Sequence, residues 1–220
     1  MRPRTMPERD DDPRPERQGF AVPQFRAVVH VIDDDDIALW MFRELLQGIG
    51  AEIRTFSSAR EFLAGYRPNP CECLVCDLRM PEIGGLDVQQ RLLDKGSHLP
   101  IILVSGYADV PHAVEAIKKG AFDFLEKPVD GALLIAKIRS ALERSRQLHA
   151  EHLARIAREA RLALLTTKER QIAELVAAGK SSPKIAQELD ISVRTVENHR
   201  ARLMEKLHVE SVAELVRLFL

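Results

Sequence analysis

Two apolar runs of this chain end in acidic residues, and this feature restricts the fold more than any other. The first run, Ala27–Ile32, continues into Asp33 and Asp34, and the second, Cys73–Cys76, continues into Asp77. Such runs are typical of buried strands, and in a parallel α/β sheet the carboxyl ends of the strands line one ligand-binding edge. We therefore expect carboxylates from two strands to converge at this edge.

Converging carboxylates repel each other unless a cation holds them. Oxygen ligands in a compact site suit Mg²⁺, which keeps several waters and leaves room for a phosphate oxygen. The pattern predicts a magnesium-dependent phosphoryl site.

The composition favours two modest domains. The chain has 220 residues, 45% hydrophobic and 30% charged, and a net charge of -1, so any DNA contact must be a local patch. No apolar stretch approaches the roughly 18 residues of a membrane span, and the start lacks an apolar signal core, so we expect a cytoplasmic protein with no membrane partner. Residues 1–25 hold five of the twelve prolines and are expected to form a disordered leader.

Residues 26–130 are predicted to form the first domain. From Ala27 to about Pro128, strand-like runs alternate with segments of helical period, which indicates a parallel sheet covered by helices. The expected fold is α/β, a doubly wound, five-stranded parallel sheet of the flavodoxin-like kind. The predicted strands are 27–32, 51–56, 72–77, 100–105 and 121–125.

Residues 131–165 carry no strand signal, and their apolar residues recur at roughly helical spacing. The segment holds seven Lys or Arg residues against three Glu, so we expect a basic helical linker that serves as a spacer or a dimer contact.

Residues 166–220 are predicted to form an all-α domain of four short helices. Thr166 with Glu169, and Ser211 with Glu214, have the spacing of capping boxes. Ser182-Pro183 offers a helix cap followed by a first-turn proline.

Four segments at the expected strand ends resemble the receiver domain of response regulators. They are Val31-Ile32-Asp33-Asp34, Asp77-Leu78-Arg79-Met80-Pro81, Ser105-Gly106 and Glu126-Lys127-Pro128. With the helical tail, everything except the leader resembles a two-component transcriptional regulator of the FixJ/NarL type. Tyr107-Ala108 stands where His-Gly is common, which bears on partner choice and phosphoryl lifetime.

The resemblance assigns roles to the acids and to one lysine. Asp77 would be the nucleophile that takes a phosphoryl group from a phosphohistidine of a sensor kinase, forming an acyl phosphate. Asp34, Asp77 and the backbone carbonyl of Arg79 would bind Mg²⁺ directly, and Asp33 would act through water. Lys127 would supply the positive charge that phosphoryl transfer needs.

Further roles concern the switch and the first helix. Ser105 ends the fourth predicted strand with a hydroxyl that can bond a phosphoryl oxygen, so it is the expected switch residue. Phe124 matches the aromatic position that changes rotamer in receivers, although an ordinary core phenylalanine is an equal alternative. Asp35 and Asp36 are expected to cap the next helix, and the family pattern makes the Lys127–Pro128 peptide cis.

Three cysteines lie close to Asp77. Side chains alternate along a strand, so Cys71 and Cys73 should point to one face and Cys76 to the other, with no fourth metal ligand nearby. We expect core residues; a redox-sensing thiol remains the alternative.

The tail has the helix and turn signals of a helix-turn-helix. The first helix is expected at Pro183–Leu189, the turn at residues 190–192 and the second helix at Val193–Leu207. The expected buried stripe of the second helix comprises Val193, Val196, Leu203 and Leu207. With this stripe buried, the other side of the helix faces outward. The candidates for contacts in the major groove lie there: Arg194, Glu197, Asn198, Ala201, Arg202 and Glu205.

The side chains of this helix suggest how DNA would be read. Asn198 suits adenine, Arg202 guanine, and Glu197 can accept from cytosine. Residues 166–220 hold nine Lys or Arg against eight acids, so two copies on paired sites would strengthen binding. The candidate phosphate contacts are Lys184, Thr195, Arg200 and Lys206.

Residues 165–170 and 194–200 resemble the LuxR-type domain, which implies DNA binding. We expect a phosphorylation-switched transcription factor with a sensor histidine kinase, double-stranded promoter DNA and a second copy of the chain as partners; RNA polymerase is a further candidate. We do not expect an enzyme. A magnesium phosphatase would need a second acid at the position of Arg79, and a tail that binds protein instead of DNA is the other alternative.

Overall fold

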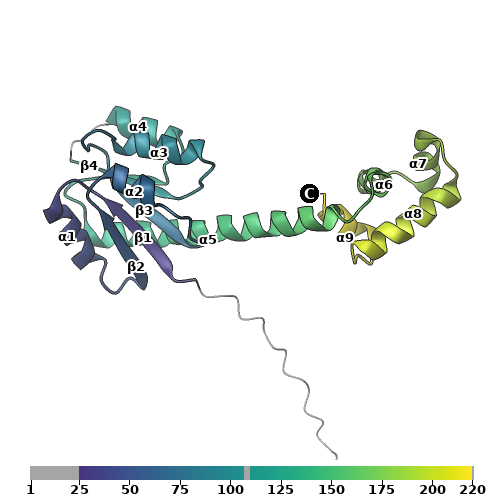
Figure 1. The fold of residues 1–220 in the computed structure, drawn as a ribbon, viewed down its shortest axis with the longest axis horizontal. Helices are drawn as coiled ribbons and strands as arrows, with labels where there is room; N and C mark the ends of the chain where they lie inside the picture. Colours follow the sequence, from purple (N-terminus) through teal and green to yellow (C-terminus); the bar gives the residue numbers. More distant parts are fainter. Residues whose placement is uncertain (1–24, 107–109, 220) are drawn as a thin grey trace, which may run out of the picture.

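The computed structural model describes residues 25–106 and 110–219, with no description of the side chains at 110 and 111. The predicted leader, apart from Phe25, and Tyr107-Ala108 lie outside the described residues. Five strands pair in parallel in the order β2-β1-β3-β4-β5, which confirms the doubly wound sheet (Figure 1). The strands are β1 (Ala27–Ile32), β2 (Ala51–Phe56), β3 (Glu72–Asp77), β4 (Ile101–Ser105) and β5 (Asp123–Glu126).

Two strands begin later than expected. Proline has no N–H to donate to a ladder, and β4 begins at Ile101, directly after Pro100. β5 begins at Asp123 because Ala121 still belongs to the turn that closes α4, where its N–H donates to the carbonyl of Ala116.

The sheet is covered on both faces, as its continuous apolar strands require. Side chains of α1 and α5 share one apolar core with one face of the sheet, and side chains of α2 and α3 share a second core with the other face. The first five helices are α1 (Asp36–Leu45), α2 (Ala59–Gly65), α3 (Gly85–Asp94), α4 (Val110–Lys118) and α5 (Gly131–Leu162).

The cysteines divide between the two cores as predicted. Cys71 and Cys73 belong to the core under α1 and α5, and Cys76 belongs to the other. All three are buried, and this burial raises the pKa of each thiol.

Helix α5 connects the sheet to the C-terminal helices, which lie at its far end (Figure 1). Its first half packs on the sheet through Leu134, Ile138 and Leu142, whereas Leu153 and Ile156 in its second half are exposed. In the part of the chain that the structure describes, no helix is both long and apolar enough to span a membrane.

Four further helices enclose a third apolar core: α6 (Thr167–Ala177), α7 (Ser182–Leu189), α8 (Val193–Lys206) and α9 (Val212–Arg217). The capping box of Thr166 and Glu169 is present. The Ser211 hydroxyl accepts from Glu214 N–H, but the Glu214 carboxylate accepts from the N–H of Glu210, so that box is not reciprocal.

Two further expectations for this domain are wrong. Ser182 is the first residue of α7, so the helix cap is Ser181, and the Ser182 hydroxyl accepts a hydrogen bond from Arg200. Val193 is 39% exposed, because α8 begins at this residue and its first turn extends past the apolar core, which contains Val196, Leu203 and Leu207.

Candidate functional site

Four predicted site residues lie at the carboxyl ends of four parallel strands. Asp33 directly follows β1, Asp77 ends β3, Ser105 ends β4 and Lys127 directly follows β5. Because these strands are parallel neighbours in register, their ends share one edge of the sheet.

The ammonium of Lys127 joins the two acids. Its Nζ lies 2.7 Å from Oδ2 of Asp33 and 2.6 Å from Oδ1 of Asp77. The carboxylates are nearly enclosed, with Asp33 2% and Asp77 8% exposed. The converging carboxylates are therefore held together by a positive charge from a third strand end.

The same contacts shift the pKa of Lys127. Burial alone would lower it, but hydrogen bonds to Asp33 and Asp77 outweigh burial and raise the pKa above its ordinary value. The side chain stays charged at neutral pH.

Backbone N–H groups fix the remaining carboxylate oxygens. Oδ1 of Asp33 accepts from the N–H of Asp35 at 3.0 Å, and Oδ2 of Asp77 accepts from the N–H of Arg79 at 2.7 Å. The Asp35 carboxylate in turn accepts from the N–H of Ile37 and caps α1, with Asp36 in its first turn, as predicted. Both buried acids are therefore oriented by the local fold and by the lysine.

The two predicted switch residues lie on neighbouring strands. Ser105 is 1% exposed, and its carbonyl accepts from the N–H of Lys127. Phe124 is half-buried and packs against the core under α2 and α3. The Lys127–Pro128 peptide is cis, in agreement with the family pattern.

The third predicted metal-binding acid differs from the other two. Asp34 is exposed, whereas Asp33 and Asp77 are buried. Among the described residues, no group of three or more His, Cys, Asp or Glu side chains is arranged to hold a metal ion. The buried donors available here are carboxylate oxygens, which are chemically suited to Mg²⁺.

Sequence reasoning missed Gly85, which packs against the end of β3 at Asp77. A Cβ at Gly85 would lie 2.7 Å from the carbonyl oxygen of Asp77 and 2.8 Å from a methyl group of Leu103. Only glycine leaves room for this approach. The signal that could have revealed it is the Gly84-Gly85 pair shortly after Met80-Pro81.

The base-reading candidates lie along one side of α8. All are exposed: Arg194, Glu197, Asn198, Ala201, Arg202 and Glu205. Ser192 caps the start of the helix by accepting from the N–H of Thr195. The predicted outward face of the second helix is present.

The phosphate candidates have different surroundings. Lys184 on α7 is exposed, and the Thr195 hydroxyl lies 2.8 Å from the hydroxyl of Ser192. Arg200 donates to the Ser182 hydroxyl, and Lys206 lies 2.7 Å from the buried carboxylate of Glu169. The charge of Lys206 is therefore largely neutralised within the domain.

Glu169 responds strongly to this environment. The hydrogen bond from Lys206, followed by that from the backbone of Thr166, lowers the pKa of Glu169 to about 2. The ion pair connects α6 to the end of α8.

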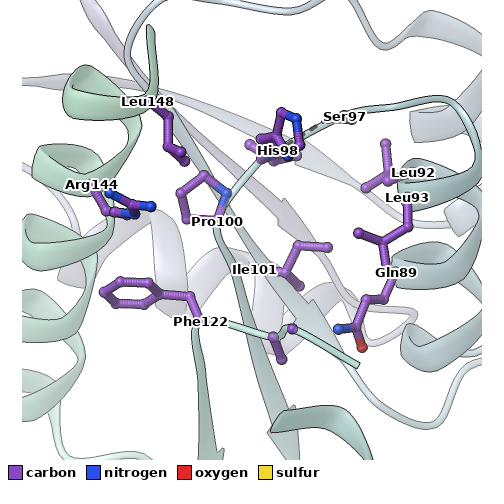
Figure 2. Close-up of a pocket in the computed structure, with 13 residues that line it drawn as sticks. Gln89, Leu92, Leu93, Ser97, His98, Pro100, Ile101, Phe122, Arg144 and Leu148 are labelled. Carbon is purple, nitrogen blue, oxygen red and sulfur yellow. Dashed lines mark hydrogen bonds between the residues drawn. The ribbon is translucent and has the colours of Figure 1, made fainter. Parts of the chain in front are cut away.

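A separate hollow lies at the opposite edge of the sheet, beside the start of β4 (Figure 2). It has a volume of about 370 Å³ and lies between α3 and α5, with Gln89 on one side and Arg144 on the other. None of the predicted site residues lines it. It is therefore distinct from the carboxylate site.

Comparison with known families divides the chain in two. Residues 29–139 match the response regulator receiver domain, and residues 163–219 match the bacterial regulatory proteins of the luxR family.

Individual proteins match both parts together. The chain is 43% identical to the transcriptional regulatory protein FixJ of Azorhizobium caulinodans, over 87% of this chain and 91% of that protein. It is 40% identical to the tetrathionate response regulatory protein TtrR of Salmonella typhimurium, over 88% of this chain and 92% of that protein.

Solved structures agree. The response regulator StyR superposes with a TM-score of 0.76 at 35% identity, covering 88% of this chain and 98% of that one. Full-length FixJ from B. japonicum superposes with a TM-score of 0.54 at 38% identity, covering 88% of this chain and 96% of that one.

Proposed function

This chain belongs to the FixJ/NarL-type response regulators of two-component systems, which regulate transcription, and from that membership we propose that a sensor histidine kinase phosphorylates Asp77. The observation that supports this assignment is the convergence of Asp77 and Asp33 on Lys127. An oriented carboxylate beside a fixed cation suits attack on an anionic phosphoryl group.

A carboxylate oxygen of Asp77 attacks the phosphorus of a phosphohistidine, the P–N bond breaks, and its electron pair returns to the imidazole. The product is an acyl phosphate on Asp77. Because the transition state is loose and anionic, positioning and countercharge from Lys127 contribute more than acid or base catalysis.

We propose Mg²⁺ as the cofactor, bound by Asp34, Asp77 and the backbone carbonyl of Arg79, with Asp33 acting through water. The oxygen donors of these residues fit this ion. When bound, Mg²⁺ would neutralise these acids and bind a phosphoryl oxygen. Lys127 holds the two buried carboxylates together, and the backbone N–H of Arg79 orients one of them.

The switch is proposed to run from Asp77 through Ser105 and Phe124. The Ser105 hydroxyl would bond a phosphoryl oxygen, and the resulting shift would change how Phe124 packs. The face formed by α4, β5 and α5 would then favour a homodimer that places two C-terminal domains on paired half-sites. RNA polymerase is a further proposed partner. We propose that the protein contacts its kinase and its promoter in the cytoplasm.

We propose that α8 enters the major groove. Glu197, Asn198 and Arg202 are exposed on one side of it and would contact base edges. Arg194, Ala201 and Thr195 lie along the same helix, and Lys184 is the exposed cation of α7. Arg200 and Lys206 already have partners within the domain and would contribute less to phosphate binding than their charges suggest.

The test compares the parent with Asp77→Asn under a small phosphodonor and Mg²⁺. We expect only the parent to form a dimer by light scattering and to bind a genomic fragment selected by the phosphorylated protein. Asp94→Asn, which removes an exposed acid at the end of α3, is the matched control and should behave like the parent. Equal dimerisation and binding by Asp77→Asn would contradict the coupling.

A further inference from the structure

A basic cleft lies where the end of α5 meets α9, outside the helix-turn-helix. It has a volume of about 430 Å³. Four arginines line it, and we refer to them as the arginine cleft: Arg155, Arg158, Arg161 and Arg217. The one acidic residue in its lining is Glu151.

Little of this positive charge is neutralised. Arg155 reaches Glu159 only at 3.9 Å between exposed side chains, and Glu151 lies 3.8 Å from Arg144, upstream on the same helix. Within the described parts of the chain, Arg158 and Arg217 form no ion pair. Exposed pairs at these distances stabilise little, so the cleft keeps a net positive field.

The cleft is held in place relative to α8. The guanidinium of Arg161 donates to the carbonyl of Leu207, the residue that caps the end of α8. Leu162 is buried in the apolar core of the C-terminal domain. The last turn of α5 is therefore fixed to the end of the proposed recognition helix, as the arrangement in Figure 1 also shows.

The C-terminal domain has little unpaired positive charge of its own. It contains nine basic and eight acidic residues, and two of its lysines, Lys180 and Lys206, form ion pairs with Glu188 and Glu169. Most sequence-independent DNA affinity comes from cations on phosphates. Arginine suits this task because its planar fork bonds two phosphate oxygens at once.

A second copy of the chain is a less suitable occupant of this cleft. Another arginine cleft would repel it, and the exposed apolar residues of α5, Leu153 and Ile156, lie on the opposite side of the helix from Arg158. An apolar helix contact would therefore leave the cleft open.

We propose that the arginine cleft binds backbone phosphates of DNA next to the end of α8, so that the linker helix enlarges the DNA-binding surface. This inference deepens the proposed DNA contacts and rests on binding by the LuxR-type domain. The contacts would be independent of sequence, because phosphates carry no base information.

The test variant removes three charges and keeps the structural arginine: Arg155→Gln, Arg158→Gln and Arg217→Gln, with Arg161 intact. The control removes three charges from an earlier part of α5: Lys137→Gln, Arg139→Gln and Arg146→Gln. The affinity of each phosphorylated full-length protein is measured across a salt series, on a selected genomic fragment and on a scrambled duplex of equal length. Circular dichroism checks that each variant is folded.

We expect the slope of log K against log salt to become shallower in the test variant by about 2 to 3 for each protomer bound, equally on both duplexes, since each phosphate contact contributes about 0.9. The control should keep the parent slope, and lysine at the three positions should restore most of it. An unchanged slope in the test variant would overturn the inference. If the variant also failed to dimerise, the cleft would be a contact between protein chains. Absence of DNA binding by the parent would instead refute the proposed function.

Discussion

The ammonium of Lys127 lies 2.6 Å from the carboxylate of Asp77, although the two residues are 50 positions apart in sequence. The ion pair places a fixed positive charge beside the oxygen that we propose as the nucleophile. It also compensates a buried charge that would otherwise be costly.

Replacing Lys127 with glutamine should slow phosphorylation from a small phosphodonor by about 10²-fold, the effect typical of losing one preorganised charge. Radiolabel incorporation against time measures this rate. Lys137→Gln is the control, because Lys137 forms an equally short ion pair with Asp123 that does not contact the site. Equal rates for Lys127→Gln and the parent would contradict the role of the ammonium.

Alanine at Gly85 should destabilise the receiver, because the new methyl group would overlap the carbonyl of Asp77. Overpacking of this kind costs about 1 to 3 kcal/mol. Urea unfolding of the full chain, followed through the single Trp40, measures the loss. Gly65→Ala has open space around its Cβ and should change the unfolding midpoint little.

Replacing Glu169 with glutamine should destabilise the C-terminal domain at neutral pH by about 1 kcal/mol. Glutamine can keep the capping hydrogen bond to Thr166, so the loss is that of the charge paired with Lys206. The folded pKa is depressed from 4.5 to about 2, so the ionised group stabilises the fold above pH 4.5. This contribution is lost as the pH falls through about 2, so the difference from the parent should shrink below pH 4.5.

Hydrogen exchange of the α6 amides in the full chain measures this effect, with parent and variant compared at each pH. At pH 7 the variant should lose about fivefold in protection. Glu174→Gln removes an exposed pair with Arg170 and should lose much less. A difference that grows on acidification would contradict the assigned ion pair.

The three cysteines should not act as redox sensors. Burial raises the pKa of the thiols of Cys71, Cys73 and Cys76, so little reactive thiolate forms at neutral pH. Mild peroxide should leave DNA binding unchanged, and a thiol reagent should label the chain only after denaturation. Peroxide-sensitive binding that is abolished by Cys71→Ser would contradict this expectation.

Two substitutions should separate base reading from phosphate contact. Asn198→Ala should cost about 1 to 3 kcal/mol on the preferred site and little on scrambled DNA. Lys184→Ala should weaken binding to both duplexes alike and reduce the salt slope by about 1 for each protomer bound. Fluorescence anisotropy across a salt series distinguishes them, and the same pattern for both variants would refute these assignments.

The sequence predicted the sheet well because strands show as short-range patterns, and the structure brings three of the predicted site residues, Asp33, Asp77 and Lys127, together at one edge of it. Continuous apolar runs indicated β1 and β3, and Asp33 and Asp77, at the ends of these runs, are the acids that meet Lys127. The capping box at Thr166 was readable because it depends on residues only three apart.

Tertiary contacts determined what sequence patterns could not. The close approach of Gly85 to Asp77 joins a helix start to a strand end, and the Arg200 contact explains why Ser182 is not a cap. Val193 matched the apolar periodicity of the helix, but it lies outside the apolar core of the C-terminal domain. The pairing of Lys206 with Glu169 likewise joins two helices far apart in sequence.

The central claim is that Asp77 receives the phosphoryl group. Treatment with a small phosphodonor and Mg²⁺, followed by borohydride reduction and peptide mass spectrometry, converts an acyl phosphate into homoserine and locates it. The account predicts homoserine at position 77, abolished by chelation of the metal and absent from Asp77→Asn. Homoserine at another acid, or none in the parent, would contradict it.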